Sequence, residues 1–225
     1  MGKIFRKREE IISFLQETLE KTGCKGYVIG VSGGIDSATV LALCSEAVGK
    51  DKIFAVTMHS TFTPKEDKED ANYLSKEYAI QHHNIEQFDF IFKSVLKYLP
   101  SSSSLTRGNL MARLRMCILY YFANHLNYLV CGTTDKSEDF IGYFTKYGDG
   151  GVDVEPIIHL TKAEVKQLAR KLGIPKRIIE KPSSPRLYPK HTAKDELGFS
   201  YETIDRLLAL NEQTKHKRKL PRRLP

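Results

Sequence analysis

The sequence predicts an α/β fold, a doubly wound and mostly parallel sheet with helices on both of its faces. Three short apolar stretches, residues 27–31, 53–58 and 128–131, have the composition of buried strands. Segments with helical spacing of apolar residues separate them. Strands that alternate with helices in this way are typical of a parallel sheet, because parallel neighbours need a long crossover connection.

The first half of the chain supplies two strand–helix units. Residues 4–21 are predicted to form an amphipathic helix that ends near Gly23, ahead of the first strand. A Ser-Gly-Gly turn follows that strand, and residues 36–48 are expected to form the next helix. Pro64 opens a further helix after the second strand. Apolar residues at 85–88 indicate a third, short strand.

The second half of the chain contains the longest helix and the last strand. Helices are predicted over 108–127, 161–172 and 200–210. Thr161 and Glu164 have the spacing of a capping box at the start of the second of these helices. The remaining segments, which we expect to be loops, are 101–104, 133–156 and 181–198.

Composition indicates one domain, residues 1–225, with a basic tail at 214–225. The formal net charge is +8, from 35 basic and 27 acidic residues, and it favours anionic partners, either nucleic acid or phosphorylated small molecules. We see no apolar run long enough for a membrane span and no secretory leader, so we expect a cytoplasmic protein. The four cysteines lack metal-binding or disulfide spacing, which agrees with a reducing compartment.

Residues 28–37, VIGVSGGIDS, carry the most informative chemistry. A buried strand leads through two glycines directly into a helix, so the backbone can approach a ligand and present N–H groups to a phosphate. Ser32 and Ser37 add hydroxyl donors. Asp36 would repel a phosphate unless a divalent cation bridged the two. The loop has neither the Gly-Lys-Ser/Thr of a Walker A loop nor the GxGxxG of a dinucleotide fold.

The SGGIDS string resembles the pyrophosphate loop of the N-type ATP pyrophosphatases, which cleave ATP between its α and β phosphates. Within that class, GTTDKSE at 132–138 and GYFTKYGDGGVD at 142–153 resemble the NAD synthetases. Shorter matches lie at 109–116, 160–162, 181–183, 196–198 and 216–218. The resemblance covers about residues 10–219 and implies an adenine-nucleotide alpha-hydrolase-like, Rossmann-like sheet.

One segment departs from the family pattern. Residues 191–194 read HTAK where many bacterial members read Gln-Thr-Asp-Glu, so two acids are missing. We therefore carry no role onto Ala193 or Lys194. The preceding residues 185–188 resemble a shorter, archaeal form of this loop.

The resemblance implies an ATP-dependent amidation of deamido-NAD, the dinucleotide of nicotinic acid. The substrate carboxylate attacks the α-phosphorus of ATP, pyrophosphate leaves, and ammonia attacks the acyl-adenylate to give NAD and AMP. Positioning and charge stabilisation are sufficient for this route, so the lack of a nucleophilic triad agrees with it. The length leaves no room for an amidase domain, which predicts free ammonia as the nitrogen donor unless a separate amidase subunit supplies it. The family also implies a homodimer with the dinucleotide at the subunit interface.

The resemblance further implies which residues bind each group. Mg²⁺ is the implied cofactor, with Asp36 and Glu138 as its ligands. The implied ATP-binding positions are Gly30, Val31, Ser32, Gly33, Gly34, Ile35, Asp36, Ser37, Thr133, Lys162 and Ser184, with Lys181 as a further phosphate candidate. The implied deamido-NAD positions are Arg113, Lys146, Asp153, His216 and Lys217. Asp149 and Asp153 are the candidates for accepting a proton from ammonium.

Two other functions share the same loop. A tRNA-modifying adenylating enzyme would use the positive charge to bind RNA, but the sequence has no zinc module and no catalytic cysteine pair. A non-catalytic ATP sensor would need no metal chemistry at the α-phosphate, which the pair Asp36 and Glu138 argues against. We therefore expect neither a nucleic-acid nor a membrane partner.

Overall fold

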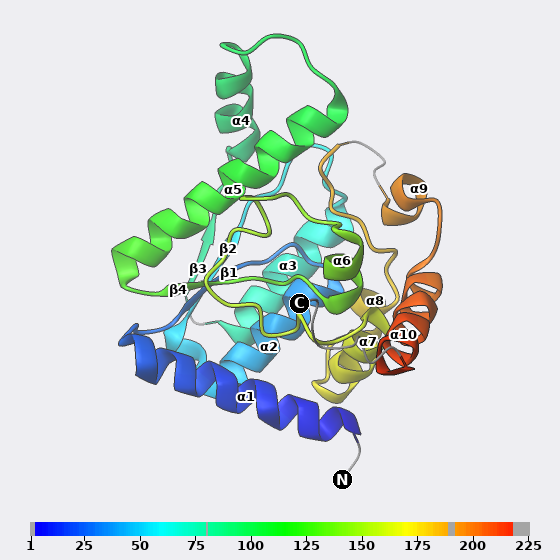
Figure 1. The fold of residues 1–225 in the computed structure, drawn as a ribbon. Coiled ribbons are helices and arrows are strands. Elements are labelled where there is room, and N and C mark those ends of the chain that lie inside the picture. The colour runs from blue at the N-terminus through cyan, green and yellow to red at the C-terminus, as the bar shows by residue number, and fades with distance from the viewer. Residues whose placement is uncertain (1–2, 80, 189–191, 218–225) are drawn as a thin grey trace, which may run out of the picture.

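The computed structural model of the chain describes residues 3–79, 81–188 and 192–217. Within these residues, parallel strands form one sheet in the order β3-β2-β1-β4 (Figure 1). The strands are β1 (Tyr27–Gly30), β2 (Ile53–Thr57), β3 (Gln81–Asn84) and β4 (Leu129–Cys131). In the register of the two central pairs, Tyr27 lies beside Ile53 on one side and Leu129 on the other. The predicted parallel α/β fold is confirmed.

Helices connect the strands and cover the sheet. They are α1 (Lys3–Thr22), α2 (Ile35–Val48), α3 (Lys65–Tyr78), α4 (Phe88–Leu96), α5 (Ser104–Leu126), α6 (Lys136–Ile141), α7 (Lys162–Lys171), α8 (Lys176–Ile179), α9 (Ala193–Leu197) and α10 (Tyr201–Lys217), with a 3₁₀ turn at η1 (Lys50–Lys52). The first turn of α7 carries the predicted capping box: Thr161 accepts from the N–H of Glu164, and Glu164 accepts in return from that of Thr161.

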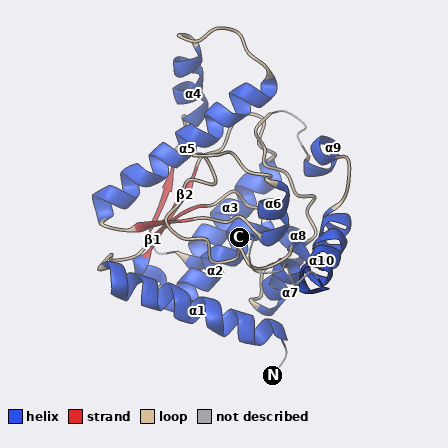
Figure 2. Cartoon of the chain, in the orientation of Figure 1, coloured by secondary structure: helices blue, strands red, loops and turns tan. Residues whose placement is uncertain are grey.

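Helices lie on both sides of the sheet (Figure 2), and each face of the sheet contributes to its own hydrophobic cluster. Tyr27 and Ile29 belong to the cluster that contains the apolar sides of α1, α2 and α7. Val28, between them in the chain, belongs to the opposite cluster, which contains residues of α4 and α5. Successive side chains of a strand point to opposite faces, so a central strand covered on both sides has to be apolar throughout.

The third strand is not where the sequence predicted it. The strand lies at Gln81–Asn84, whereas residue 88 already begins α4. All four residues of β3 are exposed, because it is the edge strand and pairs only with β2 in the described sheet. A polar edge strand has no apolar pattern to detect, and the apolar Phe88 is instead a buried residue of α4.

Short helices occupy parts of the segments that were expected to be loops. α6 lies within 133–156, and α9 lies within 181–198. α6 begins with a second capping box, in which Asp135 accepts from the N–H of Glu138 and Glu138 accepts from that of Asp135. α5 begins at Ser104, earlier than predicted, with Ser103 as its N-cap, and α10 continues past residue 210 to Lys217.

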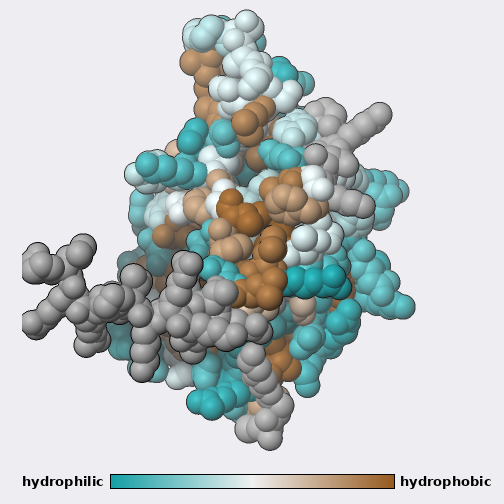
Figure 3. All heavy atoms as spheres, turned by 45° about the vertical axis from the view of Figure 1, so that its right-hand side comes forward, coloured by the Kyte–Doolittle hydropathy of each residue, from teal (hydrophilic) through white to brown (hydrophobic). Residues whose placement is uncertain are grey.

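α4 and the start of α5 project from the rest of the molecule at the top of Figure 1. This projection carries several exposed hydrophobic side chains, Phe90, Ile91, Tyr98, Leu99 and Leu105. Figure 3 shows hydrophobic residues along the projection and again in the middle of the face below it. Among the described helices none has the length and apolar content needed to span a bilayer.

Candidate active site

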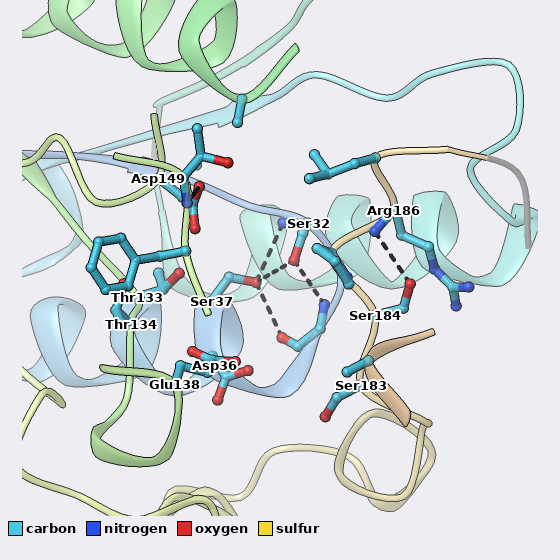
Figure 4. A pocket seen from close by; sticks show the side chains of 18 of the residues that line it. Ser32, Asp36, Ser37, Thr133, Thr134, Glu138, Asp149, Ser183, Ser184 and Arg186 are labelled. Carbon is cyan, nitrogen blue, oxygen red and sulfur yellow. Dashed lines mark hydrogen bonds between the residues drawn. The ribbon is translucent and has the colours of Figure 1, made fainter. Parts of the chain in front are cut away.

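The phosphate-loop candidate follows β1 at the carboxyl edge of the sheet and leads into α2. Hydrogen bonds join its two serines: the hydroxyl oxygens of Ser32 and Ser37 lie 3.1 Å apart, and Ser32 Oγ accepts from the N–H of Gly34 at 3.2 Å (Figure 4). Gly34 is the N-cap of α2, and no described side chain caps this end. The first N–H groups of α2 are thus available to an anion, where the helix dipole also favours negative charge.

Gly33 is the position in this loop where a side chain would not fit. Its φ is +84°, a conformation that side chains rarely adopt. A Cβ at this position would lie 2.2 Å from the backbone oxygen of Asp67 at the start of α3. The loop is therefore shaped by contact with α3 as well as by its own turn.

A lysine joins three carboxylates beside this loop. Nζ of Lys162, from the first turn of α7, lies 2.8 Å from Asp36 Oδ2, 3.0 Å from Asp135 Oδ2 and 2.9 Å from Glu138 Oε1. The Lys162 side chain is 1% exposed. Tyr201, in α10, places its ring 4.7 Å from the same ammonium and donates its hydroxyl to Glu138 Oε1. Four elements thus meet at one cation.

The ionisable side chains around Lys162 shift one another's pKa values. Burial raises the pKa of Asp135 to about 7, against the effect of the nearby ammonium. Burial also raises the pKa of Glu138. Burial alone would lower the pKa of Lys162, but the surrounding carboxylates, Asp36 first among them, hold that pKa well above its ordinary value. The surrounding carboxylates therefore favour the charged form of Lys162 at this position.

Asp36, Glu138 and Tyr201 of this group line a cavity of about 450 Å³, a volume suited to a nucleotide-sized ligand, whereas Lys162 and Asp135 are not part of its wall. Its wall includes most of the predicted ATP-binding positions: Gly30, Val31, Ser32, Gly34, Ile35, Asp36, Ser37, Thr133 and Ser184. Figure 4 shows Asp36 and Glu138 on one side of the serines, with Ser184 and Arg186 on the other. A smaller cavity of about 120 Å³ adjoins the first and shares Gly30, Thr133 and Asp149 with it.

Lys181 lines the cavity but is already held by protein groups. Its Nζ donates to the backbone oxygen of Gly33 at 3.1 Å and to Asp67 at 2.8 Å, and it lies 2.6 Å from Asp70 Oδ2. Arg186 donates to the other oxygen of Asp67 at 2.9 Å. This network connects α3, the phosphate loop and the segment that follows α8.

The predicted dinucleotide positions with described side chains lie outside the cavity walls. Arg113, on α5, is exposed and donates to the backbone oxygen of Lys146 at 3.1 Å. Asp153 accepts from the hydroxyl of Tyr120 at 3.0 Å and from the N–H of Val130 at 2.7 Å. Of the described residues, Arg113, Lys146 and Asp153 line neither of the two cavities. His216 and Lys217 end α10, and their side chains lie outside the described structure, as does the tail from residue 218.

Asp149 lines both cavities, whereas Asp153 lines neither. Asp149 accepts from the N–H of Thr145 at 2.9 Å. Although it faces the open cavity, the protein around it removes enough water to raise its pKa, against the effect of hydrogen bonds and the charge of Arg115. The two acids of the GDGGVD string therefore have different surroundings.

Several residues of the site were not predicted from sequence. Asp135 and Tyr201 contact Lys162, and neither belongs to a pattern that predicts this. His59, after β2, lines the cavity with a buried Nε2 that has no hydrogen-bond partner among the described residues. Burial and the charges of Lys68 and Arg115 lower the pKa of His59 to about 4. Of the segment 191–194, Ala193 is buried and lines the cavity, while His191 lies outside the described residues.

The predicted metal ligands fit a divalent cation that also takes phosphate oxygens. Asp36 Oδ1 is buried without a hydrogen-bond partner in the described chain, so one carboxylate oxygen is free to bind. Asp36 and Glu138 are hard oxygen donors of the kind Mg²⁺ prefers. The described residues contain no group of three or more His, Cys, Asp or Glu arranged to hold a metal by themselves. A cation here would need further ligands from a nucleotide.

A parallel α/β sheet with a glycine-rich loop at its carboxyl edge, and acids beside that loop, is the architecture of the pyrophosphatase-loop class. The family model described as NAD synthase matches residues 7–224. The chain belongs to the NAD synthase family.

Individual relatives agree with this assignment. An NH₃-dependent NAD⁺ synthetase from Staphylothermus marinus is 46% identical over 205 residues, which cover 90% of this chain and 74% of that protein. A structure titled NMN synthetase, from Francisella tularensis, has a TM-score of 0.84 and 32% identity, covering 93% of this chain and 87% of that one. A structure of an NH₃-dependent NAD synthetase from Campylobacter jejuni has a TM-score of 0.81 and 33% identity, covering 100% and 89%.

Proposed function

We propose that this protein is an ammonia-dependent NAD synthetase, which uses ATP to amidate deamido-NAD and releases NAD, AMP and pyrophosphate. The observation that carries the proposal is the cavity wall, where the phosphate loop, Thr133 and the acids Asp36 and Glu138 face one space. Family membership and the names of the relatives support the same reaction. They favour neither a tRNA-modifying enzyme nor an ATP sensor.

In this proposal, ATP lies with its phosphates on the loop between β1 and α2. The N–H groups of that turn and the hydroxyls of Ser32 and Ser37 would bind the leaving pyrophosphate. Lys162 would supply positive charge where negative charge develops. Asp36 and Glu138 would hold Mg²⁺, which supplies Lewis-acid stabilisation of the phosphate oxygens when bound. The remaining task of the protein is to hold the substrate carboxylate in line with the α-phosphorus.

Ammonia enters this reaction as the second nucleophile. Because ammonium is the major form in water near neutral pH, a base in the site would increase the reactive fraction. Asp149 suits this role better than Asp153, since it reaches both cavities and its pKa is raised. Asp153 is engaged with Tyr120 and Val130, an arrangement that suits binding or support rather than proton transfer.

We further propose a homodimer of single-domain subunits. Arg113, Lys146 and Asp153 lie away from the cavity wall of one subunit, which suits a dinucleotide that reaches a second subunit. The exposed Tyr121 on α5 supports an interface on this side of the sheet. Residues 1–225 would form one domain, since both hydrophobic clusters flank the same sheet. All four cysteines are free, which supports a cytoplasmic location.

The structure titled NMN synthetase favours a second candidate substrate, the mononucleotide of nicotinic acid. The chemistry at the carboxylate would be identical, and only the adenylate half of the dinucleotide would be missing. A product assay separates the two candidates. Purified protein is given ATP, Mg²⁺ and ammonium with either the dinucleotide or the mononucleotide, and glutamine replaces ammonium in a parallel set.

Equal amounts of NAD and AMP from the dinucleotide with ammonium would support the proposed function. A larger kcat/KM with the mononucleotide would favour the second candidate. Activity with glutamine alone would contradict the ammonia assignment. Folded protein that forms no amide from either acid would overturn the proposal.

A further inference from the structure

The Lys162 ammonium occupies the space between the two proposed metal ligands. It lies 2.8 Å from Asp36 and 2.9 Å from Glu138, and a third carboxylate, Asp135, completes its surroundings at 3.0 Å. Three carboxylates this close would repel one another strongly without a cation between them. In the described structure that cation is part of the protein.

A lysine ammonium and a divalent cation compete for the same carboxylate oxygen. Asp36 keeps Oδ1 free, but both oxygens of Glu138 are engaged: Oε1 accepts from Lys162 and Tyr201, and Oε2 accepts from the N–H of Asp135. Mg²⁺ binds oxygen at about 2.1 Å, whereas the ammonium holds its partners at hydrogen-bond distance. Each would also repel the other at this separation. Metal binding by Glu138 through Oε1 therefore requires Lys162 to leave that oxygen, whereas Asp36 can bind a metal through its free Oδ1.

The phosphate loop provides a destination for the freed ammonium. Asp36 lies in the first turn of α2, directly beside the loop, and Lys162 reaches it from α7. A nucleotide bound there would bring several negative phosphate oxygens within reach of a small movement of the lysine chain. The phosphates of a nucleotide would thus supply both the oxygens that complete the coordination of the metal and the new partner for the ammonium.

We propose that Lys162 is an exchangeable internal cation: it pairs with Asp36, Asp135 and Glu138 in the nucleotide-free protein and moves to the phosphates when Mg²⁺ arrives with ATP. In consequence, metal and nucleotide bind as a pair, and metal alone binds weakly. Lys162 thereby acts as a positioning residue for the proposed metal ligands before the nucleotide binds. The inference rests on the proposed function, because that function assigns Mg²⁺ to Asp36 and Glu138.

The test measures binding of Mn²⁺ alone, followed by the electron paramagnetic resonance of the free ion, with no nucleotide present. Lys162→Met should bind Mn²⁺ about tenfold or more tightly than the wild type, because the competing charge is gone. Lys162→Arg keeps the charge and should behave like the wild type. Lys171→Met removes an exposed lysine from the same helix and should also leave Mn²⁺ binding unchanged. Equal Mn²⁺ affinity in Lys162→Met and wild type would overturn the inference.

Thermal unfolding distinguishes an exchangeable cation from a merely structural ion pair. Lys162→Met should be less stable than the wild type in a chelator, and Mn²⁺ should restore much of the loss. A loss that Mn²⁺ does not restore would contradict the exchange. Neither measurement uses the dinucleotide, so absence of NAD formation alongside metal rescue would reject the proposed substrate and keep the exchange.

A measurement on the wild type covers the case in which Lys162→Met does not fold. A buried ammonium exchanges its protons slowly and gives a ¹⁵N signal, which Lys162→Arg assigns by removing it. The signal should shift when Mg²⁺ and ATP are added together. An unchanged signal at saturating Mg²⁺ and ATP would show that Lys162 keeps its partners, against the proposal.

Discussion

Lys162 donates to Asp36 across 126 residues of sequence, with Nζ 2.8 Å from Oδ2. This contact connects the first turn of α7 with the first turn of α2, and it places a buried positive charge beside the phosphate loop. Neither residue stands out in its local sequence. Lys162 follows the N-cap of α7, and Asp36 is an acidic residue in the first turn of α2. Of the two, only Asp36 lines the cavity, and Lys162 holds its carboxylate from behind the wall.

Gly33 offers a direct test of how tightly the phosphate loop is held. Gly33→Ala should abolish ATP binding and lower stability, because the new Cβ would lie 2.2 Å from the backbone oxygen of Asp67. Gly173→Ala is the matched control, with a φ of +75° and no atom within 4 Å of the added carbon. It should cost only about 1 kcal/mol and leave ATP affinity unchanged. Calorimetric ATP titration and urea unfolding of both variants would check this, and equal ATP affinity in the two variants would contradict it.

His59 predicts a pH dependence of stability. Its pKa is lowered from 6.5 to about 4 in the fold, so between these values the unfolded chain binds the proton more readily. The free energy of unfolding should therefore decrease as the pH falls through this window. His59→Gln should reduce the decrease by on the order of 1 kcal/mol, allowing for partial exposure of the ring.

The decrease should not vanish in His59→Gln, because burial also lowers the pKa of His82 and His159. Urea unfolding curves at several pH values between 7 and 4 would measure the slope. His125→Gln, at an exposed position on α5, serves as the control and should keep the wild-type slope. A His59→Gln slope identical to that of the wild type would show that this ring is not responsible.

Asp149 and Asp153 should affect different half-reactions. Asp149→Asn should lower the amidation rate about 100-fold, because the proposed proton acceptor is lost, while dinucleotide-dependent exchange of pyrophosphate into ATP continues. Asp153→Asn should instead raise the KM for the dinucleotide and weaken the anchor on Val130. Separate assays of pyrophosphate exchange and NAD formation measure the two effects. If Asp149→Asn also lost the exchange of pyrophosphate into ATP, Asp149 would act in the adenylation step instead.

The proposed dimer can be tested at an exposed aromatic residue of α5. The wild type should sediment at about twice the 25.6 kDa of one chain, and Tyr121→Glu should shift the mass toward a monomer, because a charge would be buried at the interface. Phe14→Glu, at an exposed position on α1, should keep the wild-type mass. Sedimentation over a range of concentrations would decide; a monomeric wild type, or the same shift in both variants, would reject this interface.

Local patterns in the sequence were sufficient for most of the fold. The buried strands, the turn at Gly33 and the capping box of α7 were predicted because each depends on neighbouring residues only. The polar strand β3 and the short helices α6 and α9 were missed. An exposed edge strand has no apolar period, and a helix of one or two turns is too short to display one.

The sequence by itself determined the parallel α/β class, the glycine-rich turn of the candidate phosphate loop and the resemblance to the NAD synthase family. Only the tertiary structure decided that Lys162 meets three carboxylates, that Lys181 is held by Asp67 and Gly33, and that Asp149 faces the cavity while Asp153 does not. The physical reason is the range of the interactions. Turns and caps are made between neighbours in the chain, whereas the partners of a charged side chain depend on which helices the packed core brings together.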